Sequence, residues 1–256
     1  MTRPDSETSE KTLSALRHSF GTATVTPDQR QTFVRDLFDR VAPRYDLMND
    51  LMSFGLHRGW KRAVARTAVA AAEKLAGDII DLAGGTGDLA TLMVKALPQR
   101  RIIIADASGG MLAVARRRLG ETVAYVEAPA EALPLADASA AVVTLSFGLR
   151  NMTDPQAALR EVHRILKPGG HLLLMEFSQA AAWFRPAYAV HSQLVIPALG
   201  AMVAGNRGAY RYLVDSIRRF PDAESLTQEL HGAGFGPVAV RRFMFGVAAL
   251  HSARKM

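Results

Sequence analysis

The chain has 256 residues, of which 49% are hydrophobic and 21% are charged. This length suits one large domain with a substantial core, and the composition excludes a mainly disordered chain. The formal net charge of +7 permits binding to an anionic membrane, a nucleic acid or an acidic substrate, without choosing among them. Because the chain has no cysteine, it excludes disulfides, zinc–thiolate sites, iron–sulfur clusters and a cysteine nucleophile.

The N-terminal segment, residues 1–25, is mostly polar, and we expect a flexible tail there, followed by a single domain over 26–256. The segment lacks the apolar run of a secretory signal, and its acidic residues argue against a transit peptide. The most apolar later stretch, residues 194–204, is about half as long as a membrane-spanning helix. We therefore expect a cytoplasmic protein, with association at the inner face of the membrane as a further possibility.

The first predicted elements are helical. Residues 27–42 begin with a proline, which is favoured at the first position of a helix, and their apolar residues recur at helical spacing. The segment 43–60 mixes aromatic and polar side chains and is predicted to be irregular. The alanine-rich segment 61–75 is predicted to be helical.

From residue 78 onward, strands alternate with helices. Strands are predicted over 78–82, 101–105, 122–127, 141–147 and 171–177, and helices over 87–97, 110–119 and 155–166. This alternation is typical of an α/β protein with a mostly parallel, doubly wound sheet. Residues 180–219 interrupt it and predict a helical lid insertion. A helix over 222–233 and a strand pair within 237–250 complete the predicted domain.

A glycine-rich loop, Asp81-Leu-Ala-Gly-Gly-Thr-Gly-Asp88, follows the first predicted strand and begins a helix. Its glycines let backbone N–H groups approach a ligand, and Asp106 at the end of the next strand can accept both hydroxyls of a ribose. The loop also satisfies the loose dinucleotide pattern G-x-G-x-x-A. Asp81 repels a pyrophosphate and favours the cationic amino-acid end of S-adenosylmethionine, which is the preferred ligand. A dinucleotide and a glycine turn without a ligand stay open.

Two further motifs carry candidate side chains. The run Ser146–Met152 follows a later strand, so Arg150 and Asn151 are expected to point into the cleft beyond the strand ends. A plain surface cation is the alternative for Arg150, because arginine is abundant in this chain. The segment Tyr45–Trp60 gathers polar, aromatic and thioether side chains and includes His57. A lid that only packs, with a structural histidine, is the alternative there.

The segment Tyr45–Trp60 resembles a signature of the ubiquinone/menaquinone C-methyltransferase family, and Arg164–Ser178 resembles that family's second signature. The resemblance extends from about Phe20 to Lys255. It implies a class I methyltransferase with a Rossmann-like fold, which uses S-adenosylmethionine to methylate a ring carbon of a polyprenyl benzoquinol or naphthoquinol. Neither a metal nor a nucleic acid is expected to bind.

The resemblance and the motifs together assign the site. Arg150 is expected to stabilise a phenolate while a water carries the proton away, and His57 and Tyr45 are the other candidate bases. Tyr45, Arg150 and Asn151 are expected at the quinol ring. The residues expected to bind the cofactor are Asp81, Gly85, Thr86, Gly87, Asp106, Pro129, Ala130 and Ser146.

Three positions depart from the family pattern. Pro129 stands where an aspartate or asparagine usually accepts a hydrogen bond from the adenine, and this loss of about 0.5–1.5 kcal/mol is expected to weaken cofactor binding roughly two- to tenfold. Ala140-Ala141 replaces a usual Phe-Asp, and His191 replaces a second lid tyrosine. These departures keep two alternatives open: another lipophilic phenol as substrate, or a non-catalytic scaffold subunit of a quinone-synthesis complex.

Residues 183–204 are more apolar than a surface insertion normally is. We expect them to line a channel for an isoprenoid tail or to dip into a membrane interface, where the net charge assists docking to anionic lipid. A homodimer contact or ordinary packing onto the sheet is the alternative.

Overall fold

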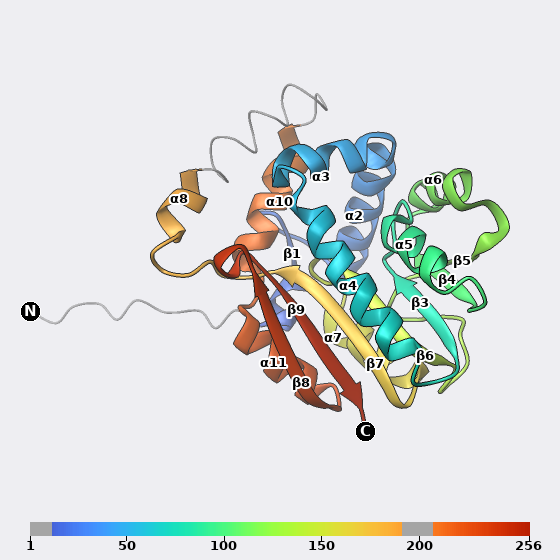
Figure 1. Ribbon diagram of the computed structural model, residues 1–256. Coiled ribbons are helices and arrows are strands. Elements are labelled where there is room, and N and C mark those ends of the chain that lie inside the picture. Colours follow the sequence, from blue (N-terminus) through green and yellow to red (C-terminus); the bar gives the residue numbers. More distant parts are fainter. Residues whose placement is uncertain (1–11, 191–206) are drawn as a thin grey trace, which may run out of the picture.

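The computed structural model describes residues 12–190 and 207–256 and is organised around a seven-stranded sheet (Figure 1). Its strand order is β5-β4-β3-β6-β7-β9-β8, and only β9 runs antiparallel to its neighbours. The predicted α/β class with a mostly parallel sheet is confirmed. The strands are β3 (Asp78–Leu82), β4 (Ile102–Asp106), β5 (Ala124–Glu127), β6 (Ala140–Ser146), β7 (Leu166–Phe177), β8 (Phe235–Phe243) and β9 (Ala248–Lys255).

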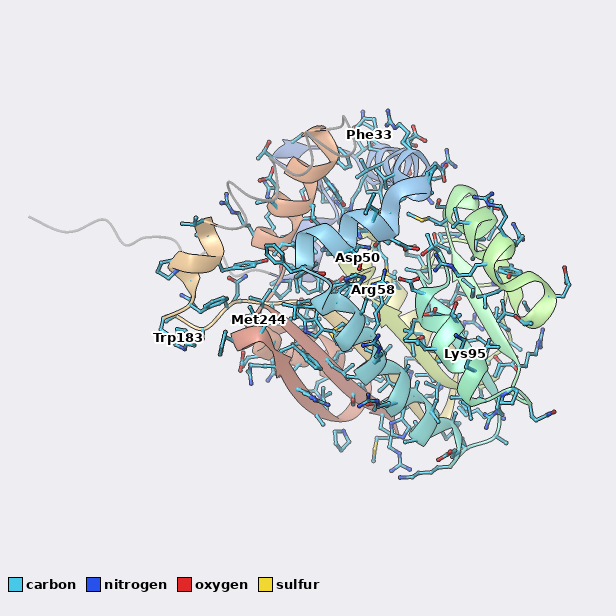
Figure 2. The ribbon with its side chains drawn as sticks, turned by 45° about the horizontal axis from the view of Figure 1, so that its top comes forward. Phe33, Asp50, Arg58, Lys95, Trp183 and Met244 are labelled. Carbon is cyan, nitrogen blue, oxygen red and sulfur yellow. The ribbon has the colours of Figure 1, made fainter. Side chains whose placement is uncertain are left out.

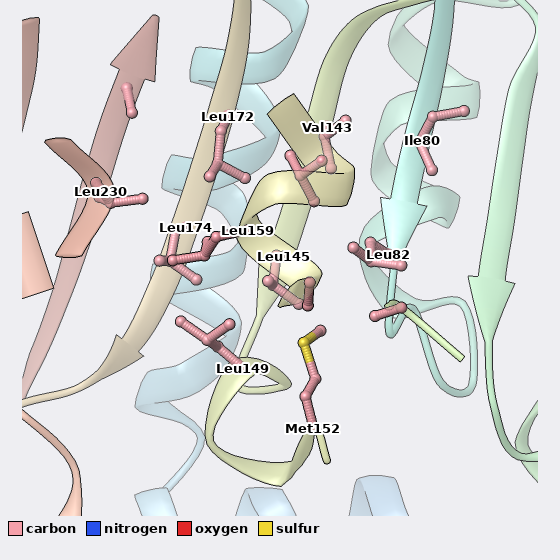
Figure 3. Close-up of a cluster of buried hydrophobic side chains, with 14 of the residues drawn as sticks. Ile80, Leu82, Val143, Leu145, Leu149, Met152, Leu159, Leu172, Leu174 and Leu230 are labelled. Atoms are coloured by element: carbon pink, nitrogen blue, oxygen red, sulfur yellow. The ribbon is translucent and has the colours of Figure 1, made fainter. Parts of the chain in front are cut away.

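Helices cover both faces of this sheet, because its central strands are apolar on both sides. One face packs against α4 (Leu56–Ala72), α5 (Asp88–Ala96) and α6 (Gly109–Leu119). The other face packs against α1 (Leu13–Leu16), α7 (Pro155–Ile165) and α11 (Ala223–Gly232). Figure 3 shows the second cluster, in which Ile80 and Leu82 of β3 lie with Leu145 of β6 and Leu174 of β7.

Side-chain caps place several helix starts where the sequence predicted them. Thr26 and Gln29 form a capping box at the start of α2 (Pro27–Val41). The Ser108 hydroxyl accepts a hydrogen bond from Met111 N at α6, and Asp154 accepts one from Ala157 N at α7. Each cap satisfies a backbone donor that has no partner within the helix.

The structure corrects the prediction of a tail for residues 12–25. They form α1 and a short hairpin of β1 (Ser19–Phe20) and β2 (Ala23–Thr24). The side chains of Leu13 and Leu16 are buried in the core, and the Leu13 N–H donates to Glu229 Oε1 at 2.9 Å. Two apolar residues are enough to attach this mostly polar segment to the core. Its polar composition alone therefore gave the wrong prediction.

The segment 43–60 is helical rather than irregular. It contains η1 (Ala42–Arg44), α3 (Tyr45–Ser53) and the start of α4. Helix α3 is separated from α4 by Phe54 and Gly55, which both have positive φ and therefore interrupt the helical conformation. The mixture of aromatic and polar residues that suggested irregular structure belongs to short amphipathic helices.

The predicted lid insertion contains α8 (Arg185–Val190) and α10 (Arg207–Arg219). Residues 191–206 of the insertion, which include His191 and the apolar stretch 194–204, lie outside the described residues. Where the structure describes the chain, no helix combines the length and the apolar character needed to cross a membrane. The remaining short helices are η2 (Gly120–Thr122), η3 (Leu149–Asn151) and η5 (Met244–Gly246).

Candidate active site

The glycine-rich loop between β3 and α5 turns at residues with positive φ, Gly85 at 57° and Gly87 at 78°. Glycine adopts these angles without the steric cost of a side chain. The turn directs Gly85 N toward Asp106, whose Oδ2 accepts its hydrogen at 2.9 Å. Asp106 Oδ1 accepts a second bond from Ser108 N at 2.9 Å. Burial raises the pKa of Asp106 to about 6, and its backbone donors act in the opposite direction.

A first cavity of about 280 Å³ lies beyond the carboxyl ends of β3, β4 and β6, at the point where the strand order reverses. In doubly wound sheets this is the usual place for a ligand. Helix α2 also lines it and is attached to the start of α6 by Asp39, which accepts bonds from the Ser108 hydroxyl at 2.5 Å and from Gly110 N at 3.2 Å. The predicted residues that line the first cavity are Tyr45, Gly85, Asp106, Pro129, Ala130, Ser146 and Asn151.

A second cavity of about 270 Å³ adjoins the first. The two share Tyr45, Ser146 and Phe147 in their walls. The Ser146 hydroxyl oxygen is buried without a hydrogen-bond partner. A buried polar atom at a shared wall is a natural partner for a ligand that reaches from one cavity to the other. The second cavity is largely apolar and is lined by Phe54, Leu56, Trp60, Phe177, Phe184, Tyr188, Leu213, Ile217, Met244 and Val247 together with Asn49, Ser53, His57, Lys61 and Arg150.

His57 lines the second cavity and is buried. The Ser53 hydroxyl lies 2.7 Å from the carbonyl oxygen of Asn49 and shares a hydrogen bond, also of 2.7 Å, with His57 Nδ1. The other ring nitrogen, Nε2, lies 3.8 Å from Asp50 Oδ1. Burial, with the nearby charge of Lys61, holds the pKa of His57 below its usual value. The imidazole is thus neutral near pH 7 and can accept a proton.

Arg150 lies in the second cavity's wall as predicted, but its charge is balanced. Its Nη1 donates to Glu176 Oε2 at 2.8 Å, and both side chains are buried. The guanidinium carbon lies 5.1 Å from the centre of the Phe177 ring. The Nε atom is buried without a hydrogen-bond partner, and among the described residues only Nη1 of this guanidinium donates hydrogen bonds. The alternative of a surface cation is wrong.

The turn that carries Arg150 is held by a buried cation from α2. Arg30 donates from Nη2 to the carbonyl of Arg150 at 2.7 Å and from Nε to the carbonyl of Met152 at 3.1 Å. Asn151 is also engaged, since its Oδ1 accepts from the Tyr212 hydroxyl at 3.1 Å and its Nδ2 donates to the carbonyl of Phe147 at 3.2 Å. Asn151 lines the first cavity and is absent from the lining of the second, so its predicted place at the quinol ring stays a prediction.

Three predicted cofactor residues lie behind the first cavity rather than in its lining. Asp81 is buried and accepts hydrogen bonds from Ala90 N at 3.1 Å and from the Thr144 hydroxyl at 2.8 Å. Burial raises the pKa of Asp81 to about 6. Gly87 starts α5, and the Thr86 hydroxyl donates to Asp46 Oδ1 at 2.8 Å. These residues shape the loop, and direct contact with a cofactor stays a prediction for them.

Sequence reasoning missed a polar network that joins α3 to this loop. Asp46 accepts from Thr86 and pairs with Arg118 of α6. Arg118 also pairs with Asp88, which pairs in turn with Lys61 at 3.1 Å. Asp46 directly follows Tyr45 in a motif already singled out. Its partners are far away in the sequence, so no local pattern indicated the contact.

The residues fit S-adenosylmethionine in two respects. The first cavity presents the carboxylate of Asp106 for ribose hydroxyls, and the unpartnered hydroxyl of Ser146 faces the wall shared with the second cavity. Within residues 12–190 and 207–256, no three histidine or acidic side chains gather in a way that could hold a metal ion. The strand order, the glycine loop and the paired cavities define a Rossmann-like class I methyltransferase fold.

Solved structures agree on this fold. The [4+2]-cyclase SpnF is 19% identical with a TM-score of 0.61, covering 88% of this chain and 96% of that one. A SAM-dependent methyltransferase from Thermotoga maritima, described as a possible histamine N-methyltransferase, is 20% identical with a TM-score of 0.57, covering 87% of this chain and all of that one (100%). At such identities the likeness shows the fold alone.

Sequence relatives identify the family. The model of the ubiE/COQ5 methyltransferase family matches residues 24–255, and the chain belongs to this family. The protein of Rubrivivax gelatinosus named ubiquinone/menaquinone biosynthesis C-methyltransferase UbiE is 49% identical over 236 residues, covering 92% of each chain. The protein of the same name from Xylella fastidiosa is 44% identical over 258 residues, covering 98% of this chain and 99% of the relative.

Proposed function

We propose that the protein transfers a methyl group from S-adenosylmethionine to a ring carbon of a polyprenyl benzoquinol or naphthoquinol. The observation that carries this proposal is the pair of cavities that share Tyr45, Ser146 and Phe147. One cavity presents carboxylates and the other is apolar, as a polar cofactor and a lipophilic ring require. The names of the relatives support the quinol as substrate.

The first cavity holds the cofactor in this proposal. When bound, S-adenosylmethionine supplies an electrophilic methyl group. Asp106 accepts hydrogen bonds from the ribose hydroxyls, and its fixed bonds from Gly85 and Ser108 hold the carboxylate in place. Pro129 and Ala130 flank the adenine from the loop after β5. Pro129 has no N–H and no side-chain acceptor, so the adenine amino group gains no bond there.

The second cavity holds the ring, and Arg150 prepares it for attack. Its guanidinium donates a hydrogen bond to a phenolate oxygen, while Glu176 balances the positive charge. Because Phe147 and Phe177 line the same wall, the ring is packed away from water, where one oriented donor is stronger than in solution. Holding ring and methyl in line lowers the entropic part of the barrier.

His57 accepts the phenolic proton at Nε2 in this proposal, directly or through one water. The resulting imidazolium is stabilised by the carboxylate of Asp50, 3.8 Å away. The phenolate charge raises the electron density of the ring carbon, which would bond to the methyl as the methyl–sulfur bond breaks. The ring carbon then loses its hydrogen as a proton, and the phenolic oxygen takes back a proton from His57 as the ring regains aromaticity. Overall, the ring exchanges one hydrogen for a methyl group, and one proton leaves as the sulfonium charge is neutralised.

The described part of the lid supports a lipophilic substrate. Phe184 and Tyr188 near α8, with Leu213 and Ile217 of α10, line the second cavity. An isoprenoid tail is thereby led toward the outer edge of the molecule. We infer that the protein works as a peripheral protein on the inner face of a membrane, which holds such a substrate.

The test compares His57→Gln with the unchanged protein and with His18→Gln, a matched control at an exposed histidine. Methyl transfer from labelled S-adenosylmethionine to reduced short-tail benzoquinol and naphthoquinol is followed against pH. We expect kcat to rise with pH through a value below about 6.5, the usual histidine pKa, and His57→Gln to lose this limb. Its affinity for S-adenosylmethionine should be unchanged, because His57 lies outside the first cavity.

The outcomes separate the alternatives. Turnover of neither quinol, with intact cofactor binding, contradicts the proposed substrate and favours another lipophilic phenol. Absence of cofactor binding contradicts the enzyme altogether and favours the scaffold subunit. An unchanged pH limb in His57→Gln removes His57 as the base and leaves Tyr45 or a water beside Arg150.

A further inference from the structure

Exposed apolar side chains surround the mouth of the second cavity. We call Phe54, Leu56, Trp183, Met244 and Phe245 the rim patch; they come from the α3–α4 turn, the segment before α8 and the β8–β9 turn. Phe54, Leu56 and Met244 line the cavity itself. Phe54 is 72% exposed, Trp183 68% and Phe245 53%. Side chains of this kind on a soluble surface mark an interaction site when they are contiguous.

Two members of the rim patch, Trp183 and Phe245, are in contact across elements. The ring centres of Trp183 and Phe245 lie 4.7 Å apart, and each ring also packs on Phe184, which lines the cavity. Figure 2 shows Trp183 and Met244 close together at one side of the molecule, well away from Phe33. Trp183 and Phe245 thus adjoin the cavity wall through Phe184, and Phe54, Leu56 and Met244 belong to that same wall.

Three of these exposed side chains stand on strained backbone. Phe54, Met244 and Phe245 have φ of 49°, 46° and 54°, in the left-handed region that disfavours residues with a side chain. Glycine or asparagine would fill such turns at a lower cost in free energy. Large apolar residues on strained backbone at an exposed rim indicate a role other than folding.

The segments that carry Trp183, Met244 and Phe245 have exposed cations and no acidic residue. The sequence has no acidic residue between Glu176 and Asp215, and none after Glu229. Trp183, Met244 and Phe245 lie in these two stretches, which also carry the exposed cations Arg185 and Arg241. Such a surface is complementary to anionic headgroups, which attract basic residues near a bilayer.

We propose that the rim patch docks onto an anionic lipid bilayer, so that the second cavity opens directly to the membrane. Tryptophan and phenylalanine are well suited to the membrane–water interface, where their rings enter the headgroup region. A polyprenyl quinol then moves from lipid to cavity without exposing its tail to water. This inference rests on the proposed function for the identity of the substrate, whereas the docking itself depends only on the rim patch.

The experiment measures cosedimentation of the full chain with vesicles of phosphatidylcholine alone or mixed with phosphatidylglycerol. The test variant is W183S/F245S, whose two residues do not line the cavity, and F33S is the matched control at a distant exposed phenylalanine. We expect binding to the mixed vesicles only. The double variant should bind about a hundredfold more weakly, at about tenfold for each aromatic side chain, and F33S should bind normally.

Turnover provides the second measurement. With a short-tail quinol in solution, W183S/F245S should match the unchanged protein, because its second cavity is intact. With a long-tail quinol in mixed vesicles, its turnover should fall about as far as its vesicle binding does. Vesicle binding without any quinol turnover would support the rim patch and overturn the proposed substrate.

Three results would overturn the inference. One is absence of binding by the unchanged chain to the mixed vesicles. Another is normal binding by W183S/F245S, with the fold checked by circular dichroism. The third is a dimer in light scattering that the double variant dissociates, which assigns the rim patch to a second copy of the chain.

Discussion

The buried ion pair between Arg150 and Glu176 allows a quantitative prediction. The pair is 2.8 Å long, and the two side chains are 5% and 1% exposed. Glu176→Gln removes the carboxylate charge and leaves the guanidinium uncompensated in the protein interior. Breaking such a pair costs about 3–5 kcal/mol of unfolding free energy. We expect a loss of that size, measured by urea unfolding followed by circular dichroism.

A matched control and a double variant isolate the electrostatic cause. Glu224→Gln breaks an ion pair with Arg242 in which the side chains are 72% and 50% exposed, and it should cost about 1 kcal/mol or less. Replacing both Arg150 and Glu176 with methionine removes both charges and keeps the volume. The double variant should recover most of the stability lost in Glu176→Gln, because no unpaired charge remains.

The double variant should nevertheless lose methyl transfer, because the guanidinium donor of Arg150 is gone. Recovered stability together with lost methyl transfer would separate the structural role of the ion pair from the catalytic role of Arg150. A loss below about 1 kcal/mol in Glu176→Gln would refute the electrostatic reasoning, since that is the size expected for exposed pairs. Full turnover in the double variant would remove Arg150 from the proposed chemistry.

Three other predictions test separate parts of the structure. Asp46→Ala removes the acceptor for Thr86 and the partner of Arg118, so the KM for S-adenosylmethionine should rise about tenfold, as measured by initial rates. Leu13→Ala should lower the free energy of unfolding, measured in urea, by about 2–5 kcal/mol, because Leu13 is buried. A change near zero would support the original prediction of a flexible tail. Burial raises the pKa of Asp106 to about 6, so its carboxylate gains a proton and loses acceptor capacity below that pH. Calorimetry should therefore show cofactor affinity falling as pH drops below about 6, and Asp106→Asn should bind weakly at every pH.

The sheet was predictable because its signals are local. An apolar run such as 78–82 followed by glycines, and a helix start such as Asp154 followed by Pro155, determine their own conformation through short-range contacts. Leu13 and the segment 43–60 were misjudged for the opposite reason. Their structure depends on what they pack against, and isolated apolar residues among polar ones carry little local signal.

The candidate site divides in the same way. The sequence by itself determined the family, the glycine loop with Asp106 at the end of the next strand, and the chemistry available at Tyr45, His57 and Arg150. These follow from residue type, order and spacing, which need no knowledge of distant contacts.

Only the tertiary structure decided which side chains share a cavity and which charges are balanced. It placed Ser146 at the junction of two cavities and Asp81 behind the first one. It paired Arg150 with Glu176, and it gathered the rim patch from three separate segments. Each of these depends on the burial and distance of groups far apart in the chain, and those quantities are set by packing rather than by any local pattern.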